Sequence, residues 1–238
     1  MAGNTPKAVL LDFHGTLAQV EPAPVAVARA AASCEVELDP IRITAIADAL
    51  NLAGWPSGPG PARVRPHLAA AWANRDLSEA DHEEAFTGLA AQIWADNPRL
   101  GFEGLADALY ARLVAPDGWL AYADTVPTLT ALKERGIPTA VISNIGFDLR
   151  PVAKDLGLDV LVDTWLLSYE LGVCKPDPAI FHRASMLLDV EPEECLMVGD
   201  TLADAAASTL GCATLLLPAS PAGSVHGLDA VIRLTDRN

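Results

Sequence analysis

Cysteine is scarce in this sequence, and long apolar runs are absent. The four cysteines form no CxxC pair and no cysteine–histidine cluster with zinc spacing, so we expect buried free thiols. No apolar run approaches the roughly 18 residues that a membrane span requires. The N-terminal stretch up to Lys7 is polar and lacks an apolar export segment. These features predict a cytoplasmic protein with no membrane partner.

Basic residues are also few. The 238 residues include 16 lysines and arginines against 31 aspartates and glutamates, a formal net charge of −15. Nucleic acids and anionic membrane surfaces both reward basic patches, so this balance argues against either as a partner. It does not exclude an anionic substrate, because a metal ion and one lysine can override the global charge locally. Since 51% of the residues are apolar, the chain can bury a sizeable core.

The order of the expected elements divides the chain. A short apolar run at residues 8–11 is typical of a buried parallel strand, and from residue 125 strands and helices alternate. We therefore expect an α/β fold: a Rossmann-like, mainly parallel sheet with helices on both faces, plus an inserted all-α domain. The core domain would comprise residues 1–17 and 119–238. Residues 18–118, where we find helices but no convincing strand, would form a cap over the sheet.

Three further segments carry local structural predictions. The Gly/Pro-rich residues 54–61 predict an exposed loop. Residues 160–167 would hold one or two short strands, and residues 230–234 a further edge strand.

Polar side chains follow several of the expected strands. Asp12 ends the first strand, Ser143 and Asn144 end the strand at residues 139–142, and Asp200 ends the strand at residues 195–198. Ligands of open α/β sheets bind beyond these carboxyl ends, so the groups should converge there. The two aspartates offer hard oxygen ligands that suit Mg²⁺, and without a cation they would repel each other.

Two further charges complete this set. Lys175 would supply positive charge, and Asp204 lies one helical turn after Asp200, so the two carboxylates would share a face. A hydroxyl and free backbone N–H groups at Ser143 would bind an anion. A carboxylate surrounded by a metal, a lysine and such donors is typical of phosphoryl transfer to an aspartate nucleophile.

With these motifs the chain resembles the haloacid dehalogenase (HAD) superfamily of hydrolases over nearly its whole length. The four motifs of that family correspond here to Asp12-Phe-His-Gly-Thr16, Ser143-Asn144, Lys175 in Cys-Lys-Pro-Asp-Pro178, and Gly199-Asp200-Thr-Leu-Ala-Asp204. The resemblance implies an α-helical cap inserted after the first strand, a Mg²⁺ cofactor and a small phosphorylated substrate.

The resemblance also implies a role for each motif residue. Asp12 would attack phosphorus and become an aspartyl-phosphate, and Lys175 would orient it and offset its charge. Substrate-binding residues would be Thr16, Ser143, Asn144 and Lys175. Metal-binding residues would be Asp12, His14 through its backbone carbonyl, Asp200 and Asp204, the last as support of the metal shell.

His14 departs from the family pattern, in which phosphatases carry an acid–base aspartate at that position. A neutral histidine beside Mg²⁺ is a poor acid for a leaving group but can act as a base for water. Three interpretations stay open: a Mg²⁺-dependent phosphatase with His14 as acid–base, a 2-haloacid dehalogenase-like enzyme, and a non-catalytic protein that binds phospho-ligands.

The remaining candidates concern specificity. Arg63 and Arg65 are the best guess for binding a second anionic group, and Trp55 could face the substrate from its loop. The other tryptophans should pack in the core, and the four histidines besides His14 should be surface or satisfied residues. The identity of the substrate and the choice between monomer and homodimer stay open.

Overall fold

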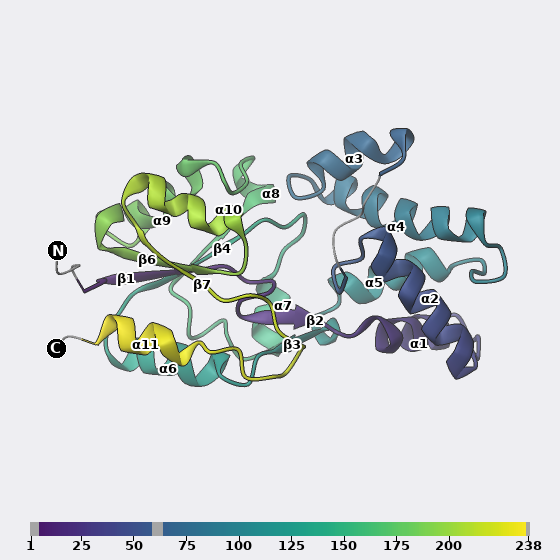
Figure 1. Ribbon diagram of the computed structural model, residues 1–238, viewed down its shortest axis with the longest axis horizontal. Helices are drawn as coiled ribbons and strands as arrows, with labels where there is room; N and C mark the ends of the chain where they lie inside the picture. Colours follow the sequence, from purple (N-terminus) through teal and green to yellow (C-terminus); the bar gives the residue numbers. More distant parts are fainter. Residues whose placement is uncertain (1–4, 59–63, 237–238) are drawn as a thin grey trace.

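A five-stranded parallel sheet forms the centre of the protein (Figure 1). The computed structural model describes residues 5–58 and 64–236. The strands lie in the order β5-β4-β1-β6-β7. Their bounds are β1 Ala8–Leu11, β4 Thr139–Ser143, β5 Thr164–Leu167, β6 Cys195–Gly199 and β7 Ala213–Leu216. The expected parallel α/β sheet is thus confirmed, and β1 is its central strand.

The side chains of β1 alternate between the two faces of the sheet. Val9 and Leu11 join a core cluster with α6, α7 and α11, whereas Ala8 and Leu10 join a second cluster with α9. All four residues are fully buried, as a central parallel strand covered on both faces requires. Figure 1 shows α9 and α10 on one face and α6, α7 and α11 on the other. The described α-helices from residue 125 onward are α6 Thr125–Glu134, α7 Arg150–Asp155, α8 Ser168–Leu171, α9 Pro178–Leu187, α10 Leu202–Ala205 and α11 Asp229–Thr235.

In the described part of the chain, five α-helices are inserted between β1 and the rest of the sheet. They are α1 Ala23–Ser33, α2 Pro40–Ala53, α3 Ala69–Asn74, α4 Glu79–Asp96 and α5 Leu105–Val114. Two of these helices begin with side-chain caps: an oxygen of Asp39 caps α2 and the hydroxyl of Ser78 caps α4. In Figure 1 these helices lie beyond the carboxyl ends of the strands.

A two-stranded antiparallel ribbon connects the inserted helices to the sheet. It pairs β2 (Ala18–Val20) with β3 (Trp119–Ala121). The expectation of no strand between residues 18 and 118 was wrong for β2. Three residues are too short for a period-2 pattern to stand out, and the strand exists only because the returning chain pairs with it.

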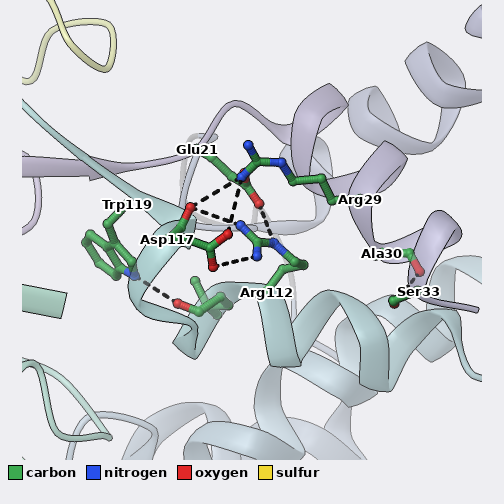
Figure 2. A network of polar contacts seen from close by, with 8 residues as sticks. Glu21, Arg29, Ala30, Ser33, Arg112, Asp117 and Trp119 are labelled. Carbon is green, nitrogen blue, oxygen red and sulfur yellow. Dashed lines mark hydrogen bonds and ion pairs between the residues drawn. The ribbon is translucent and has the colours of Figure 1, made fainter. Parts of the chain in front are cut away.

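A buried carboxylate links the segments that leave and re-enter the sheet through this ribbon. Figure 2 shows Glu21, which follows β2, pointing at the guanidinium groups of Arg29 and Arg112. Its oxygens accept hydrogen bonds of 2.9 Å from each arginine, and Arg112 also donates to Asp117 at 2.7 Å. Glu21 is 4% exposed, so the network fixes the first and last inserted helices to the ribbon through charge-assisted bonds.

Two other local expectations were wrong. The loop at residues 54–61 was expected to be exposed, but Gly54 and Trp55 are buried, and residues 59–61 lie outside the described residues. Residues 230–234 lie in helix α11 and form no edge strand, because Asp124 binds the backbone N–H groups just before the helix and Val231 packs into the core. An apolar run of this length does not distinguish a strand from a buried helix. Residues 160–167 hold one strand, β5.

Two further expectations concerned free thiols and membrane spans. All four cysteines are free; Cys195 and Cys212 are buried, whereas Cys34 and Cys174 are only half-buried. Among the described residues, no helix combines the length and apolarity that crossing a membrane would require.

Candidate active site

The chain order of the sheet brings the predicted polar residues to one edge. Asp12 directly follows β1, Ser143 ends β4, and Asp200 directly follows β6, and these three strands are neighbours. The backbone N–H of Asp12 continues the ladder by donating to Val198 O at 2.9 Å. Because β1 is flanked on both sides, its carboxylate lies at the middle of the carboxyl edge, where such sheets bind ligands.

Lys175 lies between two carboxylates. Its Nζ donates to Asp12 Oδ1 and to Asp204 Oδ1, both at 2.6 Å, and all three side chains are buried. Burial by itself would lower the pKa of Lys175, but the two carboxylates raise it above its usual value, so the ammonium stays charged. For Asp12, burial raises the pKa, and Lys175 opposes that shift.

Asp204 uses both of its oxygens within the protein. Oδ1 accepts from Lys175, and Oδ2 accepts from the Thr201 backbone N–H at 3.0 Å and the Thr201 hydroxyl at 2.8 Å, which forms a capping box on α10. Gly199 permits this approach, because a Cβ there would lie 2.2 Å from Asp204 Cγ. Asp204 therefore holds Lys175 in place.

The three carboxylates of Asp12, Asp200 and Asp204 form a compact acidic cluster. One oxygen from each lies within 4.8 Å of the others. Asp12 Oδ2 is buried and has no hydrogen-bond partner among the described residues. Burial, and then the charges of Asp12 and Asp204, raise the pKa of Asp200 to about 7. An unpartnered carboxylate oxygen beside a carboxylate that resists ionisation fits a hard divalent cation, which would relieve both penalties.

Close packing places Asp200 against the turn that follows Asp12. A Cβ at Gly15 would lie 2.2 Å from Asp200 Oδ2, and Gly15 has a φ of +92°, which side-chain-bearing residues rarely adopt. The glycine of the first motif therefore allows the two acidic loops to meet.

Asn144 fixes the backbone of the lysine loop. Its side-chain Nδ2 donates to Lys175 O at 2.8 Å, and its Oδ1 accepts from Lys175 N at 2.7 Å. Ser143 is buried and lines the cavity above Asp12. Thr16 is fully buried, and its hydroxyl has no partner among the described residues. Its predicted contact with substrate stays a prediction.

His14 lies beside the acidic cluster at the edge of the cavity. Its Nε2 lies 3.0 Å from Gln19 Oε1, and its ring meets Trp119 edge-on with centroids 5.3 Å apart. Burial lowers the pKa of His14 to about 4, so the imidazole is neutral near pH 7. With Nε2–H donating to Gln19, Nδ1 is left as the acceptor nitrogen.

A cavity of about 320 Å³ opens above Asp12 between the sheet edge and the inserted helices. Trp55 lines it, as the sequence suggested, although the indole is only 2% exposed. Arg63 lies outside the described residues, and Arg65 forms an ion pair with Asp96 and does not line the cavity. Among the described residues, the arginine that lines the cavity is Arg75, just before the α4 cap, a position that no motif marks.

His82, in α4, also lines the cavity and was expected to be a surface or satisfied residue. It is 2% exposed, and its Nδ1 lies 3.1 Å from the Tyr110 hydroxyl, so it is a satisfied buried histidine. A Cβ at Gly146 would lie 2.5 Å from His82 Cβ and 2.1 Å from Arg75 O. This glycine lets the inserted helices sit directly on the loop after β4.

A parallel α/β sheet with an aspartate–lysine–aspartate cluster at its carboxyl edge defines a hydrolase-type site. Residues 6–208 match the model of haloacid dehalogenase-like hydrolases, and the chain belongs to this family of hydrolases.

Curated relatives include phosphatases. The chain is similar to the glyceraldehyde 3-phosphate phosphatase of Methanopyrus kandleri, with 34% identity over 127 residues, 52% of this chain and 52% of that protein. It is 35% identical over 97 residues to haloacid dehalogenase-like hydrolase domain-containing protein 3 of Bos taurus, 41% of this chain and 39% of the relative. The chain thus spans about two fifths to one half of the length of these relatives.

Solved structures share the fold along the whole chain. The crystal structure of a dehalogenase matches 99% of each chain with a TM-score of 0.67 and 24% identity. A HAD family hydrolase from Deinococcus radiodurans with bound phosphate and sodium matches 97% of this chain and 89% of its own, with a TM-score of 0.56 and 25% identity.

Proposed function

We propose that this hydrolase is a Mg²⁺-dependent phosphatase of small phosphomonoesters that uses Asp12 as its nucleophile. The observation that carries the proposal is the Asp12 carboxylate, which Lys175 holds at 2.6 Å below a cavity and beside two further acids. Relatives named as phosphatases support the reaction class. The metal would be held by Asp12, Asp200 and the backbone carbonyl of His14, with Asp204 supporting it through Lys175, and would supply charge neutralisation at the phosphate.

In the first half-reaction an oxygen of Asp12 attacks phosphorus. The ester P–O bond breaks, its electron pair leaves on the alcohol oxygen, and an aspartyl-phosphate remains. Lys175 keeps the nucleophile oriented and offsets the charge of the phosphoryl oxygens, and the Ser143 hydroxyl with the Asn144 backbone N–H would bind those oxygens. The leaving alcohol oxygen takes its proton from solvent, because the one proton of a neutral His14 is on Nε2 and is donated to Gln19.

In the second half-reaction water attacks phosphorus, and the bond between phosphorus and Asp12 breaks. Phosphate leaves, and the Asp12 carboxylate is restored. His14 Nδ1 would accept the proton of the attacking water, because Gln19 holds the other ring nitrogen, and would then release that proton to solvent before the next turnover. The inserted helices, within residues 18–118, would act as the cap that shields this step from bulk water.

The test measures phosphate release from a panel of phosphomonoesters with Mg²⁺ and with EDTA. We expect release only with Mg²⁺, and none from Asp12→Asn, whereas the exposed Asp48→Asn serves as a matched control and stays active. Acid-quenched wild-type protein should carry one phosphoryl group that Asp12→Asn lacks.

Other outcomes would overturn the proposal. Halide release from 2-haloacids in EDTA would indicate a dehalogenase. Phosphate release from His14→Asp but from no ester with the natural chain would indicate a non-catalytic protein that binds phospho-ligands.

A further inference from the structure

The cavity above Asp12 is walled by aromatic rings, although aromatic residues make up only 5% of the chain. The rings contact one another in a continuous series. Centroid distances run from 4.7 Å, between His82 and Phe86, to 6.4 Å, between Trp119 and Phe147. The series comprises Trp55, Trp72, Phe86, His82, Phe147 and Trp119. Its last member touches His14, so the aromatic wall runs from the inserted helices to the nucleophile loop.

These rings are held in fixed orientations. Trp55 and Trp72 both meet Phe86 at steep angles, 80° and 66°, and His82 meets Phe147 at 61°. A wall of this kind favours a ligand with a flat aromatic ring over one with a flexible aliphatic chain. An aromatic ring can make the same edge-to-face contacts that the wall residues make with one another, and an aliphatic chain cannot. A flat apolar group in the cavity would also replace water along surfaces that are already largely apolar.

Among the described residues, the cationic groups that line the cavity, Lys175 and Arg75, are both paired with carboxylates. Lys175 lies between Asp12 and Asp204, and Arg75 Nη2 lies 3.2 Å from Asp76 Oδ2. The Arg75 guanidinium also stacks over the Trp72 ring, 4.5 Å from its centroid. Within the described part of the lining, a second anionic group on the substrate would therefore compete with a carboxylate for its cation.

We propose that the natural substrate is a phosphomonoester whose organic part is a planar aromatic group without a second negative charge, with the ring held against Trp72 and Phe147. This inference rests on the proposed phosphatase function and names its substrate class. The phosphoryl group would face Asp12 and Lys175, and the ring would extend along the wall toward Arg75 and Asp76. Attack by Asp12 breaks the ester P–O bond and leaves the aromatic alcohol, as for any ester.

The test compares four esters of primary alcohols, so that the leaving oxygen is of the same kind throughout. They are benzyl phosphate, cyclohexylmethyl phosphate, ethyl phosphate and phosphoglycolate. Benzyl and cyclohexylmethyl groups are similar in size and apolarity, and they differ in planarity. We expect KM for benzyl phosphate about tenfold below that for ethyl phosphate and several-fold below that for the cyclohexyl ester.

A matched pair of variants assigns the effect to the wall. Trp72 and Trp94 are both half-buried tryptophans of the inserted helices, but only Trp72 lines the cavity. Trp72→Leu should bring the KM for benzyl phosphate up to about that for ethyl phosphate, whereas Trp94→Leu should keep the full preference for benzyl phosphate. Equal KM values for the benzyl and cyclohexyl esters, or a preference for phosphoglycolate, would overturn the inference.

A binding measurement separates this inference from the proposed function. Benzylphosphonate and ethylphosphonate cannot be hydrolysed, and their binding in Mg²⁺ can be followed by calorimetry and by quenching of tryptophan fluorescence. If no ester is hydrolysed, the phosphatase proposal fails, and about tenfold tighter binding of benzylphosphonate would still support the aromatic site. Equal binding of the two phosphonates would overturn the inference even in an active enzyme.

Discussion

Removing the charge of Glu21 tests whether the ribbon between the inserted helices and the sheet depends on a buried ion pair. In Glu21→Gln the side chain keeps its size, and one amide oxygen can still accept from one arginine. The amide NH₂ then faces the guanidinium of the other arginine, donor against donor, where a Glu21 oxygen now accepts. Arg112, whose side chain is only 15% exposed, loses the bond from its Nε to Glu21 Oε1 at 2.9 Å.

The magnitude follows from burial. Breaking a fully buried pair costs about 3 to 5 kcal/mol, but Arg112 keeps Asp117, and Arg29 is half exposed, so solvent compensates part of the loss. One lost hydrogen bond to a charged group is worth about 1.5 to 3 kcal/mol. We therefore expect Glu21→Gln to lower the free energy of unfolding by about 2 kcal/mol. Asp117→Asn removes an ion pair of the same arginine at an exposed carboxylate and should cost less than about 1 kcal/mol.

Urea unfolding of the two variants and the natural chain measures these free energies, with Trp119 in β3 as an internal fluorophore. Equal losses for Glu21→Gln and Asp117→Asn would refute the reasoning, because the number of ion pairs and not their burial would then set the effect. So would a loss below about 0.5 kcal/mol for Glu21→Gln.

Three further predictions concern the active site and the core. Lys175→Met leaves Asp12 and Asp204 without their shared cation, so thermal unfolding should show a loss of about 3 kcal/mol that added Mg²⁺ partly reverses; no change in metal-free buffer would contradict the cluster. Gly199→Ala places a Cβ against Asp204, so it should lower the free energy of unfolding in urea by about 2 kcal/mol and should also reduce phosphate release. Full activity of this variant would rule out the close approach. Partial burial of Asp124 raises its pKa, but three backbone N–H groups hold that pKa below its ordinary value of 3.8. The charged Asp124 therefore stabilises the fold above about pH 4, and this contribution is lost as the pH falls further. Asp124→Asn should be about 2 kcal/mol less stable than the natural chain at pH 7 and equally stable near pH 2. A difference in stability that stays constant with pH would refute the assignment.

The sheet and the acidic cluster could be predicted from sequence because each depends on local rules. The apolar runs that end in Asp12, Ser143 and Asp200 mark buried parallel strands, and parallel neighbours necessarily present their last residues at the same edge. The role of Asp204 could not be read so directly. Its spacing from Asp200 predicted only that the two carboxylates share a face, whereas in the structure the Thr201 capping box and Lys175 occupy both oxygens of Asp204. Such competition among partners appears only once the turn geometry is known.

The elements that the sequence missed are those that exist through distant contacts. β2 has three residues and depends on β3, about a hundred positions later, and α11 has an apolar pattern that suits a strand equally well. In both cases a partner remote in sequence decides between conformations that local propensity leaves balanced.

The aromatic wall of the cavity also depends on contacts between segments that are distant in the sequence. Trp72 and Arg75 come from the end of α3 and the turn after it, His82 and Phe86 from α4, and Phe147 from a loop after β4. No spacing in the sequence connects them; they meet because Gly146 lets the inserted helices sit on that loop. The proposed catalytic residues therefore follow from the order of the strands, while the aromatic wall that we propose as the substrate contact depends on how two parts of the chain dock. The Arg65 hypothesis was wrong for that reason: it took nearness in sequence to the cap loop for nearness to the site, whereas docking brought Arg75 to the cavity and left Arg65 with Asp96.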